Sequence, residues 1–199
     1  MVLTDIPYGE VNRSSNGLRE LDRGCADTVE FELSELMQEL VRVCKGSMYI
    51  FCGTEQVSEI RRYLVDNKYS TRLIIWEKTN PSPMNGDTIW LSGIECCVYG
   101  KLSGATFNEH CKNTVLRYPT CNDKFRFHAT QKPIEMFKYL IKTSSNAGDL
   151  VFDPFSGSGT TAVACQELKR NYICIERDEE YYNKSMERLR VAKMRRTLI

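Results

Sequence analysis

The chain has 199 residues, with 27 basic and 26 acidic side chains, so its net charge is close to +1. That length suits one domain with a sheet covered by helices on both faces. No apolar run approaches the ~20 residues of a membrane span, and the first residues do not read as a signal segment. Nine scattered cysteines without a Cys-x-x-Cys pair predict reduced thiols in the cytoplasm rather than disulfides or structural zinc.

The charge is unevenly distributed along the chain. Residues 1–70 carry 8 basic and 12 acidic side chains, whereas residues 101–148 carry 8 basic and 3 acidic ones. Residues 184–199 carry 6 basic side chains and 1 acidic one, which is also typical of a solvated terminal helix. A basic face on an otherwise acidic molecule suits a polyanion, and we expect nucleic-acid contact within residues 101–132.

In chain order, apolar patterns of strand type alternate with patterns of helix type. Residues 9–30 are polar and predict a loop, and residues 101–128 show little periodicity. Strands that alternate with helices predict a largely parallel sheet, with ligands at the carboxyl ends of its strands. The predicted strands are 2–4, 47–52, 71–77, 94–99, 150–153 and 172–176, and the predicted helices are 31–44, 54–67, 133–144, 160–168 and one from about 178.

The most informative segment connects the strand at 150–153 to the helix at 160–168. Gly157 and Gly159 allow a ligand to lie against the backbone, and the start of the helix offers free N–H groups. The next strand ends near Glu176, whose carboxylate can hold ribose hydroxyls. The segment therefore predicts a nucleoside cofactor. Its predicted contacts are Asp153, Pro154, Phe155, Ser156, Gly157, Ser158, Gly159, Thr160 and Thr161.

The glycine pattern restricts the kind of nucleoside. No lysine follows the glycines as it does in a P-loop, and Ala162 breaks a dinucleotide fingerprint. Asp153 would repel a pyrophosphate but suits a cationic ligand such as a sulfonium or an ammonium group. A bare Gly-x-Gly would fit an ordinary tight turn equally well, and Asp153 together with Glu176 favours the ligand site.

Three segments, in this order, resemble the amino-methyltransferases that modify DNA. Residues 4–9 (TDIPYG) resemble their catalytic Asp-Pro-Pro-Tyr motif, residues 128–133 (HATQKP) the segment before the cofactor strand, and residues 153–161 their S-adenosylmethionine loop. The catalytic motif comes first, as in the β-type order of the family. The resemblance implies S-adenosyl-L-methionine as the cofactor. It also implies a single domain over residues 1–199 with a Rossmann-like class I methyltransferase fold, a mostly parallel, doubly wound α/β sheet.

The chemistry of such a transfer fits the first motif. An exocyclic amino group is a poor nucleophile because its lone pair is delocalised into the ring, and acceptors aimed at its two protons counteract this. Asp5 can supply a carboxylate, and Ile6 a backbone carbonyl, because Pro7 restricts the residue before it. Tyr8 can stack on a base that has left the duplex, worth ~1–3 kcal/mol. Ile6 replaces the usual proline of the motif, and no metal ion is required.

The resemblance also implies further contacts. The segment with Gln131, Lys132 and Pro133 lies near the methionine part of the cofactor in the family, and residues 76–81 resemble a segment near the target base. Basic residues after position 100 add candidate phosphate contacts. A lysine such as Lys78 is more often solvated, and a lone histidine such as His128 is more often a structural hydrogen-bonding residue. The predicted DNA-binding residues are Lys78, Asn80, Lys112, Arg117, Lys124, Arg126 and His128.

Two features of the family are reduced in this chain. A strand that normally precedes the catalytic motif, with an acid near the adenine of the cofactor, is missing, so the sheet is expected to lack one edge strand. Adenine binding would then depend on Phe155 and Ile175 or on a partner chain. The target-recognition region is restricted to about residues 101–128, which predicts a short site, low selectivity or help from a second subunit.

We therefore expect a DNA methyltransferase that acts on double-stranded DNA with base flipping. Adenine N6 is preferred over cytosine N4 because the motif begins with Asp5, where related cytosine enzymes more often have Ser. One alternative is an inactive methyltransferase fold that binds DNA or supports an active subunit. Another is methylation of RNA or of a protein amide. A homodimer and a role in restriction-modification, phage defence or regulation all stay open.

Overall fold

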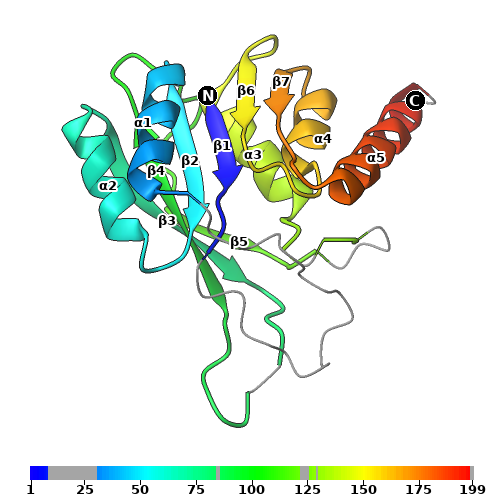
Figure 1. Ribbon diagram of the computed structural model, residues 1–199, viewed down its shortest axis with the longest axis horizontal. Coiled ribbons are helices and arrows are strands. Elements are labelled where there is room, and N and C mark those ends of the chain that lie inside the picture. Colours follow the sequence, from blue (N-terminus) through cyan, green and yellow to red (C-terminus); the bar gives the residue numbers. More distant parts are fainter. Residues whose placement is uncertain (9–30, 84–85, 122–125, 129, 198–199) are drawn as a thin grey trace.

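The computed structural model describes residues 1–8, 31–83, 86–121, 126–128 and 130–197. The predicted loop at 9–30 and Lys124 lie outside the described residues. The described part forms one sheet with helices on both faces (Figure 1). Its strands are β1 Val2–Asp5, β2 Ser47–Cys52, β3 Ser70–Lys78, β4 Ile94–Lys101, β5 Val115–Tyr118, β6 Leu150–Asp153 and β7 Asn171–Cys174. Its helices are α1 Leu33–Val43, α2 Val57–Asp66, α3 Ile134–Ser144, α4 Thr160–Glu167 and α5 Glu179–Thr197. None of these helices is long and apolar enough to cross a membrane.

The strand order is β5-β3-β4-β2-β1-β6-β7. Strand β4 is antiparallel to both of its neighbours, and every other pair is parallel. The predicted, mostly parallel sheet is thus confirmed. The carboxyl ends of β1, β6 and β7 all point to the lower edge in Figure 1.

Two apolar clusters hold the helices on the sheet. Strand β2 is buried along its whole length, so alternate side chains face opposite helices. Tyr49 and Phe51 pack with Phe137 of α3 in one cluster, and Ile50 packs with Leu40 of α1 in the other. A continuous apolar run is therefore needed in this central strand.

The centre of the sheet joins the first strand, β1, to β6, which comes late in the chain. The amino group of Met1 donates to the carbonyl of Leu150 at 2.8 Å, and the N–H of Phe152 donates to the carbonyl of Met1 at 2.9 Å. From β1 the chain continues to β2 on one side, and from β6 it continues to β7 on the other. This reversal is a topological switch point, where open α/β sheets bind ligands.

The edges of the sheet differ from the expectation. Strand β5, which the sequence did not predict, pairs with β3, although Leu116 is its only buried residue. Four residues with one buried side chain are too short a pattern to identify a strand. At the opposite edge, β7 ends at Cys174, two residues earlier than predicted.

Candidate active site

A cavity of about 520 Å³ opens at the carboxyl ends of β1 and β6. It brings the predicted catalytic segment and the predicted cofactor turn together, although nearly 150 residues separate them. Gly159 and Pro133 are not part of its wall. The predicted residues that line it are Asp5, Ile6, Pro7, Tyr8, His128, Gln131, Lys132, Asp153, Pro154, Phe155, Ser156, Gly157, Ser158, Thr160, Thr161 and Glu176.

Asp5 ends β1 and receives two donors. The hydroxyl of Tyr8 donates to Oδ1 at 2.6 Å, and the ammonium group of Lys132 donates to Oδ2. The Asp5 side chain keeps 20% of its surface exposed. A carboxylate has about four lone-pair sites, so these two donors leave it able to accept from a substrate amino group.

The cation beside Asp5 belongs to a partly buried chain of charges. The Nζ atom of Lys132 also lies 3.1 Å from Oε2 of Glu95, and the Nζ of Lys78 lies 3.0 Å from Oε1 of Glu95. Lys132 is 4% exposed. The sequence interpretation placed Lys132 near the methionine part of a cofactor, and in the structure its ammonium group faces Asp5 and Glu95. Glu95 lies on β4 and was missed, because only the pairing of β4 with β2 and β3 brings it here.

The titration of these groups is set by burial and by their partners. Burial raises the pKa of Asp5 above its ordinary value, and Lys132 opposes that rise. Burial would also raise the pKa of Glu95, but Lys132 and Lys78 together lower it. Burial disfavours the Lys132 cation, yet Asp5 and Glu95 raise the pKa of Lys132 above its ordinary value. Lys132 therefore stays protonated beside the two carboxylates.

The segment after Asp5 is held by main-chain contacts. The N–H of Ile6 donates to the carbonyl of Phe51 at 3.1 Å, and the Ile6 side chain is buried. The amide of Gln56 donates to the carbonyl of Pro7 at 3.2 Å. Packing of Ile6 thus supplies rigidity at the position where the resembling motif has proline. Gln56, at the N-cap of α2, was missed by the sequence interpretation.

Asp153 ends β6 with different partners. Its carboxylate accepts from the hydroxyl of Thr161 at 2.5 Å, from the hydroxyl of Thr4 at 2.8 Å and from the N–H of Phe155 at 3.1 Å. The residue is 3% exposed, and burial raises the pKa of Asp153 to about 6. Asp153 therefore fixes the start of the turn in addition to lining the cavity.

The turn itself needs its two glycines. Gly157 has φ of 49° and Gly159 has φ of 73°, both in the left-handed region. A Cβ on Gly159 would lie 2.9 Å from Cβ of Ser185, which is too close for a side chain. The N–H of Gly157 donates to Oε2 of Glu176 at 2.7 Å, so the predicted ribose acid reaches the turn.

The predicted DNA-binding residues are spread over several places. His128 is buried beside the turn, with its ring 4.4 Å from that of Tyr181. Asn80 accepts from the N–H of Thr120 at 2.6 Å. Lys112 pairs with Glu109, Arg117 pairs with Glu77, and Lys78, as described, pairs with Glu95; none of these three cations lines the cavity. Arg126 is exposed. A role in DNA binding stays a prediction for all of them.

The sequence and the fold were compared with known proteins. Residues 84–187 match the N6_N4_Mtase family, described as DNA methylase. The Type II methyltransferase M.HinfI of Haemophilus influenzae is 33% identical over 193 residues, which cover 84% of this chain and 54% of that protein. M.HpaI of Haemophilus parainfluenzae is 29% identical over 216 residues, which cover 95% of this chain and 67% of that protein. The chain thus spans about half the length of M.HinfI.

Solved structures agree with this assignment. The crystal structure of the M1.HpyAVI–SAM complex matches with a TM-score of 0.72 and 29% identity, covering 94% of this chain and 88% of that one. The cytosine-N4-specific PvuII DNA methyltransferase matches with a TM-score of 0.66 and 15% identity, covering 94% and 78% of the two chains, which shows a shared fold alone. The expected class I methyltransferase fold is therefore confirmed, and the chain belongs to the N6/N4 DNA methylase family.

Proposed function

We propose that this chain transfers a methyl group from S-adenosyl-L-methionine to an exocyclic amino group of DNA, with adenine N6 preferred. The main support for this proposal is that Asp5 and the glycine turn line one cavity at the switch point of the sheet. A hydrogen bond from Thr4 to Asp153 joins the two halves directly. The named relatives are methyltransferases, and M1.HpyAVI has been crystallised with SAM.

The residues of the second half fit a nucleoside cofactor. Gly157 lines the cavity, and its φ of 49° favours glycine, so a ligand can lie against the backbone there. Oε1 of Gln131 is buried in the cavity wall and has no hydrogen-bond partner among the described residues, so it can accept from a ligand donor. Phe155 and Ile175 offer apolar surface for adenine, and Glu176 offers a carboxylate for ribose hydroxyls. When bound, the cofactor supplies an electrophilic methyl group on a sulfonium.

The residues of the first half prepare the nucleophile. The Asp5 carboxylate accepts a hydrogen bond from an N–H of the target amino group. It thereby stabilises the positive charge that develops on the nitrogen. The Ile6 carbonyl is the second proposed acceptor. Lys132 opposes the rise that burial causes in the pKa of Asp5, and its hydrogen bond orients the carboxylate. The hydroxyl of Tyr8 donates a hydrogen bond to Asp5, and the ring of Tyr8 is the proposed stacking surface for the base.

The proposed substrate is double-stranded DNA with the target base flipped out. A base inside the stack cannot reach a carboxylate in the wall of a cavity, so it must leave the duplex. Residues 101–128 are the proposed target-recognition region, and they include the exposed side chains of Lys112 and Arg117. A homodimer or a partner subunit stays a prediction.

The direct test is product analysis. The protein is incubated with labelled cofactor and duplex DNA of varied sequence, and the DNA is digested to nucleosides. N6-methyladenine is the expected product, whereas N4-methylcytosine would correct the preferred base. Absence of both products would refute the proposal. Competition between duplex DNA and RNA separates the two polymer substrates.

Asp5→Ala tests the role of the carboxylate. We expect transfer to fall by about a hundredfold to a thousandfold, because one preorganised acceptor is removed, while calorimetric binding of the cofactor is retained. The variant leaves Lys132 with one carboxylate fewer, so Asp5→Ala with Lys132→Met is the charge-balanced companion. Asp66→Ala, at the exposed end of α2, is the matched control. A fully active Asp5→Ala variant would refute this mechanism.

A further inference from the structure

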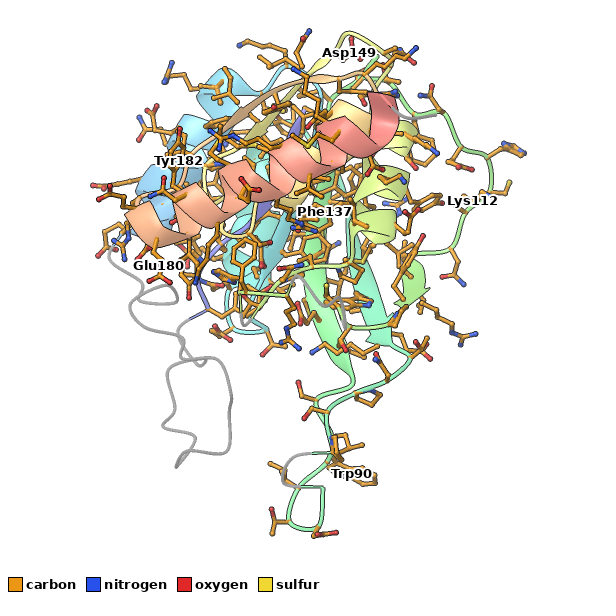
Figure 2. All side chains as sticks on the ribbon, turned by 90° about the vertical axis from the view of Figure 1, so that its right-hand side faces the viewer. Trp90, Lys112, Phe137, Asp149, Glu180 and Tyr182 are labelled. Atoms are coloured by element: carbon orange, nitrogen blue, oxygen red, sulfur yellow. The ribbon has the colours of Figure 1, made fainter. Side chains whose placement is uncertain are left out.

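The loop between β3 and β4 forms a finger, defined as residues 79–83 and 86–93. It extends beyond the carboxyl ends of the parallel strands, on the side of the molecule where the cavity opens (Figure 1). Figure 2 shows Trp90 on the projecting part of the finger, away from the packed body. Trp90 is 95% exposed, Ile89 67% and Leu91 43%. These three residues, named the apolar tip, have no counterpart in the sequence interpretation.

The base of the finger is tied to the active site. The N–H of Lys78 donates to the carbonyl of Gly93 at 2.8 Å and closes the base. From the same two strands, Lys78 and Glu95 continue the ion-pair chain to Lys132 and thus to Asp5. The position of the finger is therefore fixed relative to the catalytic carboxylate.

The finger also has internal order. The N–H of Gly86 donates to the carbonyl of Pro83 at 3.0 Å. A Cβ on Gly86 would lie 3.0 Å from Cδ2 of Leu91, so this leucine folds back on the turn. Trp90, in contrast, is left almost fully in water, where a large apolar side chain marks an interaction surface.

The composition of the finger, apolar and without cations, indicates which part of a DNA duplex it can contact. Residues 79–93 contain a single charged residue, Asp87, so the finger has no cation to bind phosphate. The apolar part of a duplex is its base stack. Each arm of the finger has about seven residues and can reach up to ~23 Å, enough to meet a duplex whose target base occupies the cavity.

We propose that the apolar tip inserts into the base stack of duplex DNA next to the flipped nucleotide; this rests on the proposed function. Removing a base from the stack costs a few kcal/mol. An aromatic side chain stacked on a neighbouring base returns about 1–3 kcal/mol, and apolar wedges are a known way to open base steps. The finger thus stabilises the opened duplex while Asp5 holds the base that has left it.

The first experiment follows the emission of Trp90. The chain has two tryptophans, and Trp76 is 2% exposed, so the solvent-exposed signal comes from Trp90. Titration with a duplex should quench this emission and protect it from acrylamide. Trp90→Phe should bind the duplex without the change. Because this readout requires no methyl transfer, a quenched protein that does not methylate DNA would refute the proposed function and retain the finger.

The second experiment measures methylation. Trp90→Ala should lower kcat/KM for duplex DNA by about tenfold or more, and Trp90→Phe should recover most of it, because a stacked base contributes ~1–3 kcal/mol. A single-stranded substrate should stay within about threefold, because it has little stack to open. The salt dependence of duplex binding should keep its slope, since no phosphate contact is lost. Ile173→Ala, 52% exposed on β7, is the matched control and should behave like the parent protein.

Three outcomes would overturn the proposal. The first is transfer to duplex DNA with no change in Trp90 emission. The second is an equal loss in Trp90→Ala on duplex and single-stranded substrates, which would mean a structural role. The third is a dimer in light scattering that Trp90→Ala converts to a monomer, which would assign the tip to a second copy of the chain.

Discussion

The two aspartates at the centre of the sheet end neighbouring strands and differ in nearly everything around them. Asp5, at the end of β1, is held by an ammonium group and a phenol and keeps part of its surface open. Asp153, at the end of β6, is held by two hydroxyls and a backbone N–H and is closed to solvent. Position at a strand end thus does not decide what a carboxylate does. The hydrogen-bond partners of the carboxylate and its exposure to solvent decide its role.

Electrostatics separates the two roles. Burial raises the pKa of both carboxyls, but only at Asp5 is it opposed by a cation, Lys132. At Asp153 the opposing interactions are hydrogen bonds from Thr161, Thr4 and Phe155, and its pKa is about 6. Asp5 therefore has a neighbouring cation that favours its ionised form, whereas Asp153 builds the turn on which the ligand is proposed to lie.

Among the groups that surround the two aspartates, the Lys132 cation is the one whose removal is expected to have the largest effect. Lys132→Met leaves Asp5 and Glu95 without their shared partner, which should destabilise the fold by about 3 kcal/mol and lower kcat by about a hundredfold. Without Lys132 the pKa of Asp5 rises further, so as the pH falls, activity should be lost at a higher pH than in the parent protein. The pH profile of kcat measures this shift.

Glu95→Gln is the informative companion to this variant. The charge of Glu95 raises the pKa of Asp5. Its removal should therefore move the acidic limb of the pH profile of kcat to lower pH, opposite to the effect of Lys132→Met. Lys132→Arg retains the charge and should keep the limb in place. An acidic limb that stays unchanged in both Lys132→Met and Glu95→Gln would show that Asp5 does not control activity.

The second prediction concerns the stability of the Asp153 side. A carboxyl whose pKa rises from 3.8 to about 6 on folding favours the folded state most below pH 3.8, and this stability is lost as pH rises through 6. Between pH 5 and pH 7.5 we expect the free energy of unfolding to fall by about 1.4 kcal/mol, and Asp153→Asn to flatten the change. Denaturant titrations at pH 5 and pH 7.5 measure the free energy of unfolding at each pH. An equal change between the two pH values in the parent protein and in Asp153→Asn would contradict the prediction.

The contrast between the two halves also explains what could be predicted from sequence. Asp5 and the glycine turn follow apolar strands, so their place at one edge of the sheet was accessible from pattern and motif order. Glu95 was not, because β4 is inserted antiparallel between β3 and β2, and only this pairing brings its side chain to Lys132. Gln56 was also missed, because its contact with Pro7 depends on where α2 begins and not on any motif.

The smallest effect is expected at the bond that joins the halves. The hydroxyl of Thr4 donates to Oδ1 of Asp153 across 149 positions of sequence, and both residues are buried. Thr4→Val keeps the shape of the side chain and removes the donor, so the free energy of unfolding should fall by about 1 kcal/mol at pH 7.5. The loss should shrink at pH 5, where Asp153 is largely protonated and a weaker acceptor. Thr4→Ser retains the donor and should recover most of the stability. In a double-mutant cycle with Asp153→Asn, additive effects of the two substitutions would show that the bond does not couple the halves, and the two aspartates would then be independent sites that share an edge.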